Sequence, residues 1–112
     1  MHELSLCHAL FKQIELLASQ IHARRIVAIE LQIGPLAGVE PSLLKNAFDL
    51  RKQNSIAQHA ILRIEQSEIK AHCPQCHTDY DSTINDLRCP QCLCAGHLLS
   101  GNEILITGLD YN

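Results

Sequence analysis

Aromatic residues are scarce in this chain of 112 residues, which has two Phe, two Tyr and no Trp. Basic residues are not in excess either, because nine Lys and Arg stand against twelve Asp and Glu and leave a formal charge of −3. Nucleic-acid-binding proteins need a basic surface, so this balance argues against DNA or RNA as a partner. No apolar run approaches the ~18 residues of a membrane-spanning helix, and Met1-His2-Glu3 is not the basic start of a signal peptide.

The composition that remains is that of an ordinary globular protein, with 46% hydrophobic and 19% charged residues. A chain of this length forms one small domain, or one small domain that carries a smaller module. Its six cysteines occur without an export signal. Cysteines in that setting are expected to be reduced thiols of a cytoplasmic protein, and reduced thiols favour metal binding over disulfides.

Two copies of the same four residues dominate the second half of the chain. Cys73-Pro74-Gln75-Cys76 and Cys89-Pro90-Gln91-Cys92 are separated by twelve residues. Each Cys-x-x-Cys hook presents two sulfurs from one tight turn, and a short hairpin between two hooks completes a tetrahedron of thiolates. The spacing predicts a structural zinc site with Cys73, Cys76, Cys89 and Cys92 as ligands. The alternative reading is a pair of disulfides or redox dithiols.

Other potential ligands lie close to the hooks. His72 and His77 flank the first hook, and Cys94 follows the second. These residues are either solvated side chains and a spare thiol, or partners in ligand exchange, because zinc accepts both imidazole and thiolate ligands. His77 and Leu93 also follow the two hooks where zinc knuckles often have Gly, which leaves the geometry of both turns open.

Two segments are predicted to be helical. Residues 3–22 carry apolar side chains at the spacing of one buried helix face, namely Leu6, Cys7, Leu10, Ile14, Leu17, Ala18 and Ile21. A second helix begins at Pro41, a residue favoured at the first helical position, with Glu40 before it as the cap. It continues to about Lys52 and buries Leu44, Ala47 and Phe48.

Three segments are predicted to be strands. Residues 26–33 alternate, with Val27, Ile29, Leu31 and Ile33 expected on the buried face. A second strand is expected over residues 60–69, and a third runs from Ile104 to Tyr111, where β-branched residues are frequent. The sequence therefore predicts an α+β fold in which two helices pack on a small, about three-stranded sheet. The zinc ribbon is inserted before the last strand, so that residues 1–70 and 102–112 form one domain and residues 71–101 the other.

The amino terminus carries a second group of metal-binding atoms. The Met1 amine, the His2 backbone amide and the His2 imidazole can close fused chelate rings around one ion. A nitrogen set of this kind suits square-planar Ni(II) or Cu(II). The alternative is a frayed terminus with an ordinary histidine. His8 and His97 could supply a further ligand, but they are read first as a surface helix residue and a loop residue, and His22 and His59 as solvated.

Several of these stretches together resemble the HypA/HybF family of accessory proteins. The opening residues 1–6 (Met-His-Glu-Leu-Ser-Leu), Ile33-Gly34-Pro35-Leu36, Val39-Glu40-Pro41, the paired hooks and Gly101-Asn102-Glu103 follow one another in the family's order. Leu44 with Ala47-Phe48 fits the same pattern. The resemblance covers nearly the whole chain, and the combination of motifs is specific although most of them are not specific singly.

The resemblance implies a protein that delivers nickel during [NiFe]-hydrogenase maturation. It implies a nickel site on His2, with the Met1 amine and Glu3 as further candidates, and a structural zinc on the four hook cysteines. It also implies a maturation GTPase and the hydrogenase large subunit as partners, and leaves a homodimer open. The expected function is that of a cytoplasmic metallochaperone and not of an enzyme.

Two other function classes remain as alternatives. The first is a zinc-ribbon adaptor without nickel delivery, which the acidic balance disfavours where the partner would be nucleic acid. The second is a redox iron protein, because the same hooks can hold iron in rubredoxin-like folds. No Ser/His/Asp grouping or phosphate-binding loop is visible in the sequence, and a closed zinc site has no open position for a substrate. Catalysis is therefore the weakest interpretation.

Overall fold

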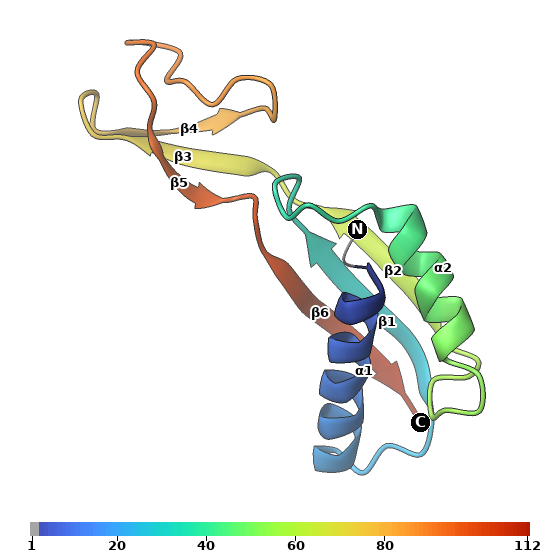
Figure 1. The fold of residues 1–112 in the computed structure, drawn as a ribbon. Helices are drawn as coiled ribbons and strands as arrows, with labels where there is room; N and C mark the ends of the chain where they lie inside the picture. Colours follow the sequence, from blue (N-terminus) through green and yellow to red (C-terminus); the bar gives the residue numbers. More distant parts are fainter. Residues whose placement is uncertain (1–2) are drawn as a thin grey trace. The chain divides into compact units, whose positions relative to one another are not determined.

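The computed structural model describes residues 3–112, which form two helices and six strands (Figure 1). The helices are α1 (Glu3–Gln20) and α2 (Pro41–Arg51). One sheet has the strand order β2-β1-β6 and contains β1 (Ile26–Ile33), β2 (Ile61–Gln66) and β6 (Ile104–Tyr111). The other has the order β4-β3-β5 and contains β3 (Ile69–Cys73), β4 (Thr78–Ser82) and β5 (His97–Ser100). The α+β class with two helices and an inserted cysteine module is confirmed.

The chain divides into two compact units. The first, called the helical unit below, comprises the chain up to Leu31 together with Val39–Ile64 and Ile106–Asn112. The second, called the ribbon unit, comprises Gln32–Gly38 and Glu65–Leu105. The ribbon unit therefore contains all four hook cysteines and the whole β4-β3-β5 sheet.

An apolar core between the two helices and the sheet holds the helical unit together. Phe11 on α1 and Phe48 on α2 stack with their ring centroids 5.2 Å apart, and both helices lie on one face of the sheet (Figure 1). The largest fully buried side chains around them come from both helices and from β1, namely Ile14, Ile26, Ile29, Leu31 and Leu44. Leu44, Ala47 and Phe48 are buried as predicted, whereas Phe11 belongs to the core without having been assigned to the apolar face.

The first helix is shorter than predicted because a left-handed residue ends it. His22 has φ +55°, and the N–H of Ala23 donates to the carbonyl of Ala18 over 2.9 Å. The His22 N–H donates in the same turn to the carbonyl of Ser19. This pair of bonds is the Schellman arrangement, in which a helix normally places Gly at the left-handed position. The helix therefore stops at Gln20, and Ile21 lies in the turn.

The alternation predicted for the first strand is wrong at Val27. β1 buries Ile26 and Ala28, and then Ile29, Leu31 and Ile33. Ala28 and Ile29 are thus two consecutive buried residues, which interrupts the alternation of buried and exposed positions. Val27 is 40% exposed.

The single strand predicted over residues 60–69 is in fact two strands in two different sheets. β2 ends at Gln66 and β3 begins at Ile69. Between them, the N–H of Ser67 donates to the carbonyl of Ile33, and the Ser67 hydroxyl donates to Oε1 of Glu103 over 2.6 Å. These two bonds hold the chain where it changes from one sheet to the other.

Gly34 lies against the segment that leads into β6. The Gly34 N–H donates to the carbonyl of Glu103, and the N–H of Leu36 donates to the carbonyl of Gly101. A Cβ atom on Gly34 would overlap the backbone carbonyl group of Gly101. The Gly-Pro pair after the first strand is therefore more than a strand terminator, because the close approach of two backbones requires glycine there.

Candidate metal centre

The first hook is the turn between two antiparallel strands. β3 ends at Cys73, β4 begins at Thr78, and these two residues face each other in the ladder. The N–H of Cys76 donates to Sγ of Cys73 at 3.4 Å, so the turn curls around the first sulfur. His77 completes the turn with φ +53°.

The second hook has the same shape although no named strands flank it. An isolated bridge joins Arg88 to Ala95, and the N–H of Cys89 donates to the carbonyl of Cys94 at 2.8 Å. The N–H of Leu93 donates to the carbonyl of Cys89 at 2.9 Å, and Leu93 has φ +63°. His77 and Leu93 therefore adopt the left-handed conformation for which zinc knuckles often use Gly, which answers how the two turns form without glycine.

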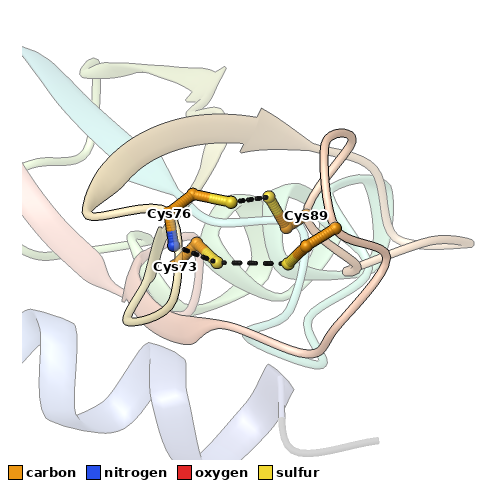
Figure 2. A group of neighbouring side chains, drawn as sticks. Cys73, Cys76 and Cys89 are labelled. Carbon is orange, nitrogen blue, oxygen red and sulfur yellow. Dashed lines mark hydrogen bonds between the residues drawn. The ribbon is translucent and has the colours of Figure 1, made fainter.

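The four hook sulfurs converge on one point (Figure 2). Sγ of Cys73 lies 3.5 Å from Sγ of Cys92, and Sγ of Cys89 lies 3.9 Å from Sγ of Cys76. All four sulfurs lie within 4.8 Å of one another. A tetrahedral ion with metal–sulfur bonds of about 2.3 Å requires sulfur–sulfur separations of about 3.8 Å, so the arrangement fits a four-thiolate ion.

All six cysteines lie in the described residues, and all are free thiols. Cys73 and Cys89 are buried, while Cys76 and Cys92 are half-buried. As protonated thiols the four hook groups interfere with one another. Loss of hydration, followed by side-chain hydrogen bonding with Cys92, Cys73 and Cys89, raises the pKa of Cys76 to about 12. The backbone N–H of Cys94 lowers the pKa of Cys92. A cation bound between the four sulfurs would favour their deprotonated forms, and its binding would release their protons.

The residues next to the hooks do not join the cluster. His72 precedes Cys73 on β3, and side chains alternate along a strand, so His72 lies on the face opposite to Cys73. Its Nδ1–H donates instead to Oδ1 of Asp79 at 2.7 Å. Cys94 is exposed, and its thiol donates to Oε1 of Gln75 at 3.5 Å.

None of the other histidines in the described residues belongs to a cluster of three or more ligand atoms. His8, His22 and His59 are exposed, as the sequence predicted. His97 is also exposed, but it is the first residue of β5 and not a loop residue, so the prediction for its setting is wrong. The strand was missed because it has only four residues, His97–Ser100, and its pairing with β3 is interrupted by a register irregularity.

Of the three candidate nickel ligands at the amino terminus, the structure describes only Glu3. Met1 and His2 lie outside the described residues. Glu3 is the first residue of α1 and is only 7% exposed. Its buried carboxylate lies in the first turn of the helix, where the exposed amide groups and the helix dipole favour a negative charge.

Tyr80 is a structural residue of the ribbon unit that sequence reasoning did not find. Its hydroxyl donates to the carbonyl of Leu87 at 2.7 Å, across the loop between the hooks. Gly96 packs against the same ring, because a Cβ atom at Gly96 would overlap the Tyr80 hydroxyl. The one available signal was a lone aromatic residue between two aspartates, in a chain with few aromatic residues.

No helix formed by residues 3–112 is long and apolar enough to cross a membrane.

Comparison with protein families gives a match over nearly the full chain. A family model described as "HypA: Hydrogenase/urease nickel incorporation, metallochaperone, hypA" matches residues 1–111. The hydrogenase maturation factor HypA of Nitrosospira multiformis is 32% identical over 111 residues, which cover 98% of this chain and 96% of that protein. The hydrogenase maturation factor HypA of Dehalococcoides mccartyi is 35% identical over 98% of this chain and 93% of its own length.

The fold also has a solved counterpart. The solution structure of the Ni metallochaperone HypA from Helicobacter pylori superimposes with a TM-score of 0.75, and the match covers 99% of this chain and 97% of that chain. The two sequences are 24% identical, so this likeness concerns the arrangement of helices and strands.

Proposed function

Because this chain belongs to the HypA family of hydrogenase/urease nickel-incorporation metallochaperones, we propose that it carries nickel at its amino terminus and a structural zinc in its ribbon unit. Its function is that of a nickel metallochaperone for hydrogenase maturation, and such a protein moves an ion without catalysing a reaction. The observation that carries this conclusion is the family match over residues 1–111.

The zinc is assigned to Cys73, Cys76, Cys89 and Cys92. Their sulfur–sulfur distances of 3.5 and 3.9 Å support a tetrahedral thiolate site. Four protein ligands fill the coordination sphere of zinc, which leaves no open position for substrate or for rapid transfer. The ion therefore holds the ribbon together and is not the cargo. Residues 71–101 are the zinc-binding domain in this proposal, and residues 1–70 with 102–112 are the nickel-binding domain.

Nickel is assigned to His2, with the Met1 amine and Glu3 as further candidate ligands. The support is chemical, because an amine, a backbone amide and an imidazole that follow one another at a chain end suit square-planar Ni(II). A site at a chain end is also open to a receiving protein, whereas the thiolate cluster is closed. The burial of Glu3 at the start of α1 favours a role in fixing the first turn next to the site.

A protein that delivers nickel needs partner proteins that assist the transfer and receive the ion. A maturation GTPase and the hydrogenase large subunit are the proposed partners, in the cytoplasm, and a homodimer is compatible with the same chemistry. Zinc-ribbon adaptors share the cysteine cluster but have no need of a terminal nickel chelate. The two functions therefore differ in one measurable property, which is specific nickel binding.

The test is calorimetric titration of nickel into zinc-loaded protein with an unextended amino terminus. His2→Ala is expected to abolish the tight nickel site while zinc content and thermal unfolding stay unchanged. Glu3→Gln keeps the shape of the buried side chain and should weaken nickel binding less. An uncleaved residue ahead of Met1 should be as damaging as His2→Ala, because it converts the amine into an amide. Parent-like titration of the His2→Ala protein would place the site elsewhere and leave the adaptor as the better reading.

A further inference from the structure

A row of three potential metal ligands crosses the exposed face of the β4-β3-β5 sheet. His72 on β3 faces Asp79 on β4 and His97 on β5 in the two ladders. Residues directly opposite each other in neighbouring strands project from the same face, with Cβ atoms roughly 4.5–5.5 Å apart. β3 is the middle strand (Figure 1), so His72 is the centre of the row.

Asp79 fixes the His72 ring in the state that a metal ion requires. A carboxylate only accepts hydrogen bonds, so in the neutral ring Nδ1 carries the proton that binds Asp79 Oδ1 at 2.7 Å. The lone pair of the ring is then on Nε2. Histidine ligands in metal sites almost always donate their other N–H to a carboxylate or carbonyl in this way, which holds the ring and raises its basicity.

His97 provides the second imidazole. It is exposed and begins β5, so its ring is free to rotate among its side-chain conformations. Among the residues the structure describes, only the four cysteines form a group of three or more whose ligand atoms already converge. An ion on the row would therefore draw the His97 ring toward Nε2 of His72, and two rings on opposed residues are close enough to share an ion at about 2.0–2.1 Å from each nitrogen.

The charges around the row favour a cation. The neighbouring position on the same face of β3 is Lys70, whose ammonium group lies 2.8 Å from Oδ1 of Asp81 and 3.8 Å from Oε2 of Glu68. These two carboxylates neutralise the Lys70 charge, so that it repels a cation bound at the row less strongly. Asp79 is 68% exposed and adds a further negative charge beside His72.

We propose that His72 and His97 form a second, exchangeable metal site on the face of the ribbon sheet opposite to the cysteine cluster, with Asp79 positioning His72. Imidazole nitrogen suits zinc, copper and nickel, and water completes the coordination of an ion held by two side chains. The site is open, unlike the four-thiolate cluster. It goes beyond the terminal chelate proposed above and does not depend on it.

The experiment uses zinc-loaded full-length protein with the His2→Ala substitution as background, titrated with Ni(II) alone. One weak nickel ion per chain is expected in this background. His97→Ala and His72→Ala should each lower its affinity at least tenfold. Asp79→Asn should lower it by about tenfold, which is the lower end of the effect of losing such a supporting carboxylate. His59→Ala removes an exposed histidine from the helical unit and should change nothing.

Two readouts separate ligation from a structural role. Zinc content and thermal unfolding of each variant should match the background, and paramagnetic Ni(II) should selectively broaden the ring signals of His72 and His97. If His72→Ala does not fold, the exposed His97→Ala decides the question. The proposal is overturned if the background binds no nickel, if His97→Ala binds as the background does, or if His59→Ala weakens binding equally. Failure of the terminal site would appear separately, as equal binding by the parent and the His2→Ala protein.

Discussion

The two three-stranded sheets of this protein differ in what covers them. The β2-β1-β6 sheet packs against α1 and α2, and its core contains two phenylalanines and a set of fully buried Ile and Leu side chains. The buried residues of the β4-β3-β5 sheet are only Ile69, Ala71 and Cys73. Seven large apolar side chains of the ribbon unit are exposed instead, namely Ile84, Leu87, Leu93, Leu98, Leu99, Ile104 and Leu105.

The difference shows that the two units are stabilised by different physical effects. Burial of apolar surface supplies the free energy of folding in the helical unit. The ribbon unit has too little apolar burial for this, and in our proposal the binding of a metal ion by the four hook cysteines supplies the missing free energy, as it does in small zinc modules. A substitution in one unit should therefore affect a property that the corresponding substitution in the other unit leaves alone.

Cys73→Ser should have the largest effect. Structural zinc contributes about 10–16 kcal/mol of apparent binding free energy in zinc-finger peptides, and Cys73 is a fully buried candidate ligand. We expect loss of zinc and unfolding of the ribbon unit, while the helical unit keeps its amide spectrum. Metal analysis measures the loss of zinc, and heteronuclear NMR measures the unfolding of the ribbon unit.

Cys94→Ser is the matched control and should keep one zinc per chain, since Cys94 is exposed. Retention of zinc and of parent-like melting by Cys73→Ser would show that the cluster has no structural role.

Phe48→Ala is the counterpart in the helical unit. Phe48 is fully buried against Phe11, and truncation of a core phenylalanine costs about 3–5 kcal/mol. Chemical denaturation should show this loss of unfolding free energy, while the zinc content of the folded protein stays at one per chain. Leu50→Ala lies on the same helix at a position that is 79% exposed and should change stability by less than about 0.5 kcal/mol. A Phe48→Ala protein that lost zinc in proportion to its stability would contradict the separation of the two effects.

Glu103 offers a smaller, pH-dependent test within the ribbon unit. The Ser67 hydroxyl, followed by the Gly101 N–H, lowers the pKa of the Glu103 carboxyl from its ordinary value of 4.5. A lowered pKa in the folded state means that these bonds stabilise the fold above pH 4.5 and cease to do so as the pH falls through the folded pKa. In Ser67→Ala the titration midpoint of the Glu103 carboxyl carbon, followed by NMR, should rise toward the ordinary value. The exposed Glu65 carboxyl in the same spectra is the internal reference, and an unmoved Glu103 midpoint would contradict the assignment.

Leu93→Gly should have the smallest effect, and it should be stabilising. The left-handed conformation costs a non-glycine residue about 1–2 kcal/mol, and Leu93 is 61% exposed, so its side chain contributes little packing in return. Part of the gain is offset because glycine is more flexible in the unfolded chain, which leaves an increase of at most about 1 kcal/mol. Chelator competition for zinc measures it, with Leu93→Val as the comparison, because a β-branched residue tolerates positive φ poorly. Equal zinc retention by the Gly and Val variants would be evidence against backbone strain at this position.

Local patterns in the sequence predicted most of the helical unit. The apolar spacing of α1, the Pro41 start of α2 and the strand from Ile104 to Tyr111 all have their cause within a few consecutive residues. The errors arise where distant residues decide the outcome. Val27 is exposed because burial along β1 departs from regular alternation between Ala28 and Ile29. The strand predicted over residues 60–69 is broken where Ser67 bonds to Ile33 and Glu103.

The sequence by itself determined the four thiols of the candidate zinc site, because a Cys-x-x-Cys hook is a local device and twelve residues suffice to bring two hooks together. It likewise indicated the family, through motifs spread along the chain. Only the tertiary structure decided which neighbouring side chains share the faces of the ribbon sheet. Strand register sets His72 beside Asp79 and His97. The register of β5 depends on its pairing with β3, a strand that lies apart from it in the chain, and a strand of four residues carries too weak a pattern to reveal it.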